Sequence, residues 1–162
     1  MQKIMPCLWF DTQAEQAVNF YTSLFNHSKI LDVTRYDETS AQVAQMPAGT
    51  VMTITFQIEG QDYMALNGGP AFKFTEAVSF IVNCESQAEV DRLWNALIAN
   101  GGEESQCGWL KDKYGLSWQI VPTALDRLMT SGTPAQAQRV MAAMFQMKKL
   151  DLAKLEQAYN QA

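Results

Sequence analysis

The chain has 162 residues, 48% of them hydrophobic, and a formal net charge of -5. This length suits one well-buried core and is too short for two domains of ordinary size, and the hydrophobic content excludes a disordered chain. Lys148 and Lys149 are the only adjacent basic residues. The sequence therefore lacks the clustered basic face that nucleic acid binding requires, and we expect no nucleic acid partner.

Neither a membrane span nor a secretory signal is visible. No apolar run approaches the ~18–20 residues that a spanning helix needs, and residues 1–6 lack the basic flank and apolar stretch of a signal peptide. We expect a cytoplasmic protein with no membrane partner. The cysteines are too widely spaced for a disulfide framework or a zinc knuckle. Cys7 and Cys84 lie in apolar runs and are predicted to be buried, whereas Cys107 is predicted to be accessible.

The first predicted elements are a strand at residues 7–10 and a helix after it. Thr12 and Glu15 have the spacing of a capping box, in which a hydroxyl and a carboxylate each accept a hydrogen bond from a free backbone N–H at a helix start. Apolar residues then recur at spacings of three and four up to Phe25. This pattern predicts an amphipathic helix that ends near Asn26.

A hairpin is predicted later in the first half. Residues 51–58 alternate strictly, which is typical of a strand. Residues 59–62 supply a turn, and residues 63–66 form the returning strand. The sequence Asn-Gly-Gly-Pro at residues 67–70 then breaks the chain, and we place the boundary between two units there. The acidic residues at 37–38 are interpreted as part of a polar loop.

The second half repeats the first. Ser86-Gln87-Ala88-Glu89 follows Thr12-Gln13-Ala14-Glu15 after seventy-four positions, again behind a short apolar run at residues 80–82, and predicts a second capped helix. This helix is predicted to end in the Asn-Gly-Gly sequence at residues 100–102, where glycine can take the left-handed conformation. Three segments follow: a short strand at 108–110, a turn at 111–115 and an alternating strand at 116–121.

The remaining residues are predicted to form helices outside the repeat. Thr133-Pro134 places a cap before a proline at the first helical position, and a methionine-rich apolar stripe follows. Asp151 is predicted to cap a last helix. A stripe of this kind is more often core or an oligomer interface than a ligand-binding face.

Each half supplies too few strands to bury its own sheet, so the two are expected to pair in one α+β domain over residues 1–162. The predicted parts of this domain are a first unit at 1–70, a second unit at 71–122 and a C-terminal helical extension at 123–162.

Five sequence blocks are distinctive in their order: residues 9–25, 65–70, 107–112, 114–122 and 139–155. Together they resemble the PhnB-like family of the vicinal-oxygen-chelate (glyoxalase/bleomycin-resistance/dioxygenase) superfamily, whose members often carry the name 3-demethylubiquinone-9 3-methyltransferase. The resemblance implies paired βαβββ modules that form a cupped mixed sheet around a cavity. It also implies a homodimer.

The resemblance raises the question of a metal site, because relatives such as glyoxalase I hold a metal with four ligands, mainly His, Glu and Gln. Three of the four positions fall on poor ligands here: Met5 or Pro6, Thr53 or Thr55, and Ala77 or Ser79. The fourth keeps a donor, Gln119. One amide oxygen does not hold a divalent cation that needs three or more protein ligands, and His27 is expected to be a solvated turn residue. We therefore expect no metal and no other cofactor.

Without a metal, function would depend on a pocket lined by aromatic and polar side chains. The strands supply the candidates Trp9, Thr53, Thr55, Tyr63, Asn67, Ser79, Trp109, Ser117 and Gln119. If Leu116, Trp118 and Ile120 face the helices, the opposite face of that strand, with Ser117 and Gln119, is left for the cavity.

The leading hypothesis is a non-metal protein that binds an unidentified planar or amphipathic small molecule. One alternative is a lyase, isomerase or dioxygenase with atypical metal ligands, and another is an interaction protein that binds its partner through the C-terminal helices. Methyl transfer, suggested by the family name, is disfavoured. The Gly68-Gly69 pair is followed by Pro70 rather than by the helix that a glycine-rich donor-binding turn would open.

Overall fold

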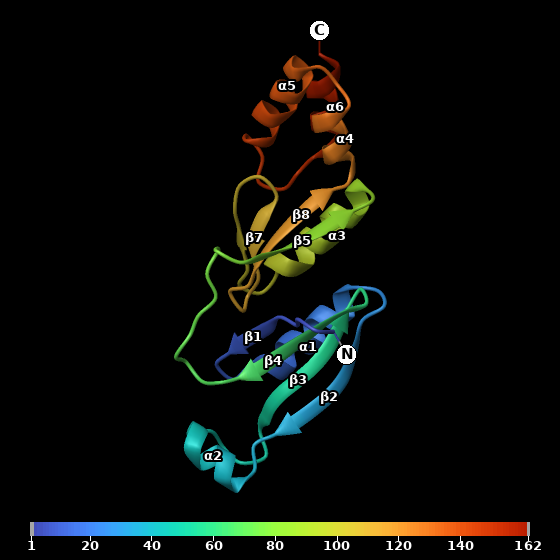
Figure 1. Ribbon diagram of the computed structural model, residues 1–162. Coiled ribbons are helices and arrows are strands. Elements are labelled where there is room, and N and C mark those ends of the chain that lie inside the picture. The colour runs from blue at the N-terminus through green and yellow to red at the C-terminus, as the bar shows by residue number, and fades with distance from the viewer. Residues whose placement is uncertain (1, 162) are drawn as a thin grey trace. The chain divides into compact units, whose positions relative to one another are not determined.

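The computed structural model describes residues 2–161, which divide between Phe74 and Thr75 into two compact units. The first unit contains β1 (Cys7–Phe10), α1 (Ala14–Leu24), β2 (Lys29–Arg35), α2 (Glu38–Ala44), β3 (Val51–Ile58) and β4 (Gln61–Asn67). The second contains β5 (Ser79–Cys84), α3 (Gln87–Ile98), β6 (Glu103–Glu104), β7 (Trp109–Lys111), β8 (Ser117–Pro122), α4 (Ala124–Thr130), α5 (Pro134–Met144) and α6 (Leu152–Asn160) (Figure 1). The α+β class is confirmed.

The two units share one sheet topology, which confirms the internal repeat. The strand orders are β1-β4-β3-β2 and β5-β8-β7-β6. In each sheet the first strand pairs in parallel with the last strand along the chain, and the remaining pairs are antiparallel. A parallel pair needs a long crossover, and in each unit the capped helix is part of it.

The core of the first unit lies between α1 and one face of its sheet. Ile54 and Phe56 of β3 are fully buried, as are Val18 and Tyr21 of α1. Burying a side chain of this size stabilises the fold by ~1.5–3 kcal/mol. Thr53, Thr55 and Gln57 of the same strand lie on the other face and are only half-buried.

The capping box predicted at Thr12 is wrong. Helix α1 has Gln13 at its N-cap, and no side chain of this segment caps it. Instead, the side chain of Asn67, at the end of β4, accepts a hydrogen bond from Ala14 N at 2.8 Å and donates one to Val51 O at 3.0 Å. The free N–H at the helix start is thus satisfied from a distant strand.

The second unit follows the sequence predictions more closely. Ser86 Oγ accepts a hydrogen bond from Glu89 N at 3.2 Å and caps α3 as predicted, although the carboxylate of Glu89 accepts from Glu85 N rather than from Ser86. Trp118 and Ile120 of β8 are buried, as is Trp94 of α3. The face of β8 predicted to pack on the helix is therefore in the core.

The C-terminal helices form a small core of their own. Leu128 of α4, Val140 of α5, Leu155 of α6 and Leu150 before α6 are buried together, with methionines of α4 and α5 packed against them. Thr133 with Gln136 caps α5, and Asp151 caps α6, as predicted. Part of the methionine-rich stripe is therefore core.

Two further predictions need correction. Asp37 does not lie in an irregular loop, because its carboxylate caps α2 through a hydrogen bond from Ser40 N at 2.7 Å. Cys7 is exposed, since it lies on the face of β1 opposite the helix-covered Leu8, whereas Cys84 is buried as predicted. Within residues 2–161, no helix combines the length and apolarity needed to cross a membrane.

Candidate functional site

Three neighbouring strands of the second unit present one row of side chains on the sheet face opposite α3. Strand pairing places Gln119 of β8 directly between Ile81 of β5 and Trp109 of β7. Because directly opposed residues of paired strands share a face, these three side chains form a continuous surface. Ile81 is 60% exposed, and Trp109 and Gln119 are half-buried.

This row forms one side of a pocket of about 670 Å³. The pocket is lined by Ile81, Ser105, Gln106, Cys107, Trp109, Gln119, Val121, Leu125, Met144, Phe145 and Leu150. We call it the sheet–extension pocket, because its last four lining residues come from the C-terminal helices and the segment between them. None of the lining side chains is charged. Its volume lies within the ~300–1,000 Å³ typical of small-molecule sites.

Polar groups lie along β8 on the same face. Gln119 Nε2 donates a hydrogen bond to Ser79 Oγ at 2.9 Å. Ser117, paired with Ser79 in the sheet, is only 1% exposed, and its Oγ has no hydrogen-bond partner among residues 2–161. Leaving a buried hydroxyl without a partner costs ~1–3 kcal/mol. The Ser117 hydroxyl therefore still has the capacity to form a hydrogen bond at this end of the β8 face.

Cys107 lies in the turn that leads into β7. Its φ of 58° is in the left-handed region, which non-glycine residues seldom adopt. The thiol is half-buried, so Cys7 is the most accessible cysteine, rather than Cys107 as predicted. The Sγ of Cys107 lies 3.7 Å from Met144 O. The turn thus contacts the C-terminal segment at the edge of the pocket.

Three predicted residues of the first unit share the sheet face that α1 does not cover. Trp9 pairs with Leu66, which pairs with Thr53 in turn, and Thr55 is two positions further along β3. The Thr53 hydroxyl lies 2.6 Å from that of Thr34. The structure therefore brings these three residues onto one surface.

The position of Trp9 explains the glycine pair that follows β4. Trp9 Nε1 donates a hydrogen bond to Gly69 O at 2.8 Å, and its ring packs edge-on against Phe72 at 4.9 Å. A Cβ on Gly68 would lie 2.2 Å from the indole, so only glycine fits there. Gly68-Gly69 therefore holds a tryptophan in place, rather than opening a helix as a donor-binding turn would.

Tyr63 and Asn67 lie on the opposite, helix-covered face of the first sheet. Tyr63 stacks on Phe56 at 5.6 Å between ring centroids, and burial raises the pKa of its hydroxyl. Asn67 makes the bonds to Ala14 and Val51 described above. Of the nine predicted residues, Trp109 and Gln119 line the pocket, and Ser79 and Ser117 adjoin Gln119 on its face.

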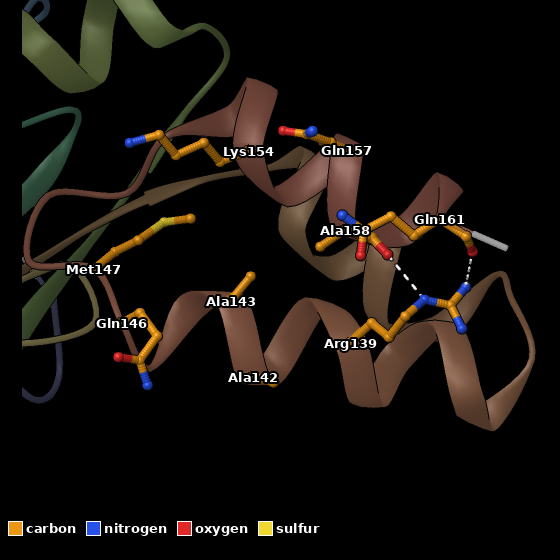
Figure 2. A pocket seen from close by; sticks show the side chains of 9 residues that line it. All are labelled: Arg139, Ala142, Ala143, Gln146, Met147, Lys154, Gln157, Ala158 and Gln161. Carbon is orange, nitrogen blue, oxygen red and sulfur yellow. Dashed lines mark hydrogen bonds between the residues drawn. The ribbon is translucent and has the colours of Figure 1, made fainter.

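A second hollow, of about 560 Å³, lies between α5 and α6 (Figure 2). Its most polar lining group is Arg139, which Figure 2 shows directed at the end of α6. The guanidinium donates hydrogen bonds to the carbonyl oxygens of Ala158 at 3.0 Å, Tyr159 at 3.2 Å and Gln161 at 2.6 Å. The last carbonyls of a helix are those that need partners from outside it, so Arg139 caps α6 and holds it against α5.

The buried carboxylate of Asp112 is also engaged structurally. It accepts hydrogen bonds from Tyr114 N at 2.9 Å, Leu116 N at 3.1 Å and Trp118 Nε1 at 2.9 Å. This arrangement closes the β7–β8 turn, which the sequence predicted at residues 111–115. Both oxygens of this carboxylate are therefore engaged by donors of the same turn and strand.

The residues do not fit a metal site of the kind known in this superfamily. In residues 2–161, no group of three or more His, Cys, Asp or Glu side chains is placed to hold an ion. The amide of Gln119 lies among uncharged groups, and His27 is exposed in the turn after α1. Divalent cations need several anionic or imidazole ligands, and the sheet face with Gln119 offers neither kind.

Comparison with known proteins identifies the family. A family profile described as 3-demethylubiquinone-9 3-methyltransferase matches residues 2–121. The chain belongs to this family. A PhnB protein from Bacillus cereus, named for the same methyltransferase, is 38% identical with a TM-score of 0.67, and the match covers 75% of this chain and 99% of that chain. No curated protein matches the chain.

More distant structures share the fold of the vicinal-oxygen-chelate superfamily. Protein PA1353 from Pseudomonas aeruginosa is 20% identical, with a TM-score of 0.58 over 75% of this chain and 98% of that chain. The fosfomycin resistance protein FosX from Listeria monocytogenes, solved with Mn(II) and sulfate, is 15% identical, with a TM-score of 0.53 over 82% and 100%. At these identities the likeness concerns the fold alone.

Proposed function

We propose that this PhnB-like protein binds an uncharged small molecule in the sheet–extension pocket without the aid of a metal. The observation that carries the proposal is the pocket itself, which combines the aromatic ring of Trp109 with the amide of Gln119 and has no charged lining residue. A charged ligand would lose hydration there without gaining a counter-charge. A planar, largely apolar molecule with one polar group suits this lining best.

The family name does not favour methyl transfer as the function. The glycine pair that could have marked a binding site for a methyl donor instead contacts Trp9. The indole packs against Gly68 and donates a hydrogen bond to Gly69 O. Metal-assisted lyase, isomerase or dioxygenase chemistry is not favoured either, because the donor set described above does not suit a divalent ion. Assembly into a homodimer stays a prediction, which light scattering on the purified protein would check.

Tryptophan fluorescence provides the test of the proposal. Trp94 and Trp118 are buried, so a ligand in the pocket should act on Trp109. We expect a saturable change in emission when a panel of uncharged aromatic metabolites is titrated. The change should disappear in Trp109→Phe and persist in Trp9→Phe, which removes the half-buried indole of the other unit.

Two results would contradict the proposal. One is the absence of any saturable change across the panel. The other is a change of equal size in wild type and Trp109→Phe, since the ligand would then bind away from the pocket.

A further inference from the structure

The C-terminal extension supplies a wall of the sheet–extension pocket. Leu125 of α4, Met144 and Phe145 at the end of α5, and Leu150 before α6 all line it. The family profile ends at residue 121, before α4 begins, and the Bacillus cereus chain is matched almost completely by three quarters of this chain. This wall therefore lies beyond the part of the chain that the family profile matches, and the profile does not support the resemblance predicted for residues 139–155.

The wall is held in place by backbone bonds to the turn before β7. Cys107 N donates to Met147 O at 2.8 Å, and Gly108 N donates to Lys148 O at 2.7 Å. Gly108 has a φ of +84°, and a Cβ there would lie 2.9 Å from Ile120 O and 3.2 Å from the Leu150 side chain. The turn thus needs glycine both for its conformation and for the close approach of the extension.

Side chains of α3 hold the same segment from another direction. The amide of Gln87 donates to Leu150 O at 3.1 Å and accepts from Leu152 N at 2.8 Å. Lys149 forms an ion pair with Asp91 at 2.6 Å. These bonds fix the backbone at Met147, Lys148 and Leu150 against the turn before β7 and α3.

We propose that this wall determines which ligand the pocket accepts, with Phe145 as the main specificity-determining residue. The inference rests on the proposed function. Phe145 is 57% exposed although it lines the pocket, so a bound aromatic ring can still cover it. Trp109, which also lines the pocket, supplies a second aromatic surface. The ligand class is an uncharged planar aromatic molecule.

The test uses three probes with one ring system and different charges: β-naphthol, β-naphthoate and β-naphthylmethylamine. Binding is followed by the indole N–H signal of Trp109 in nitrogen-15 NMR spectra of the full chain, assigned with Trp109→Phe. We expect wild type to bind β-naphthol at least about tenfold more tightly than either charged probe.

Phe145→Ala is the test variant and should weaken binding of β-naphthol about tenfold, because it removes most of one aromatic surface. Met141→Ala is the matched control. Met141 lies on the same helix and is 39% exposed, but it does not line the pocket. Both side chains are exposed, so neither change should affect folding, and the control should bind like wild type.

The outcomes separate the two proposals. No movement of the Trp109 signal in wild type with any of the probes would overturn the proposed function, and with it this inference. Binding by wild type that Phe145→Ala leaves unchanged would overturn the role of the wall alone. Equal binding of β-naphthol and the charged probes would overturn the assigned ligand class.

Discussion

Gln87 offers a direct test of how the C-terminal extension is attached. Its side-chain amide bridges the backbone at Leu150 and Leu152, where the chain enters α6. Leu152 N belongs to the first turn of α6 and has no partner within the helix, so the Gln87 oxygen satisfies a group that would otherwise be free. We predict that Gln87→Ala loosens α6 while leaving the sheet of the second unit folded.

The magnitude follows from the bonds that are lost. Each of the two amide bonds to the backbone contributes ~0.5–1.5 kcal/mol, so the opening free energy of α6 should fall by about 1–3 kcal/mol. The additional bond from Gln87 Nε2 to Asp91 at 3.1 Å adds little, because that carboxylate also pairs with Lys149. A loss of about 2 kcal/mol corresponds to roughly thirtyfold faster amide exchange.

Hydrogen exchange of the α6 amides is the suitable assay, since local opening of one segment is read directly. The repeat provides the control. Gln13 occupies the position of Gln87 in the first unit, but its exposed side chain accepts only one bond, from Thr12 N at 3.2 Å. Gln13→Ala should therefore change stability by less than about 0.5 kcal/mol. Exchange in α6 that is no faster in Gln87→Ala than in wild type would refute the reasoning.

Two further predictions concern backbone geometry and pH. In urea unfolding, Gly108→Ala should destabilise the chain by several kcal/mol more than the control Gly115→Ala. Both glycines have a φ near +85°, but only at Gly108 would the added Cβ meet Ile120 O, at 2.9 Å. Equal losses of stability in the two variants would contradict this. Burial raises the pKa of Cys84 from 9.0 to about 12, so the folded state holds this proton more tightly than the unfolded state. Its contribution to stability is complete below pH 9 and should fall as the pH rises from 9 towards 12, and wild type and Cys84→Ala should converge over that range in pH-dependent unfolding.

The strands and helix caps that local patterns predicted depend on residues within one segment of the chain. The strict alternation of residues 51–58 matches β3 in both bounds, and the caps at Ser86, Thr133 and Asp151 form as expected. The cap at Thr12 failed for a long-range reason. Asn67, fifty-three residues away from Ala14, takes over the helix start, and no local pattern reports that approach.

The residues of the candidate site also differ in whether a local pattern could predict them. Alternation along β8 indicated that Ser117 and Gln119 face away from α3, and their face adjoins the pocket. Parity along β4 could have assigned Tyr63 and Asn67 to the core face, had the pairing of β4 with β3 been known. Phe145 carried no signal beyond an apolar stripe, which helix packing and an exposed wall produce alike.

The sequence alone determined the duplicated strand–helix–strand units and the caps of the later helices, because each depends on residue type and short spacing. Only the tertiary structure decided that the segment from Met144 to Leu150 lies against the Cys107 turn and Gln87 and completes a pocket with β8. These contacts join residues far apart in the chain, and their geometry follows from how whole elements pack rather than from any local pattern.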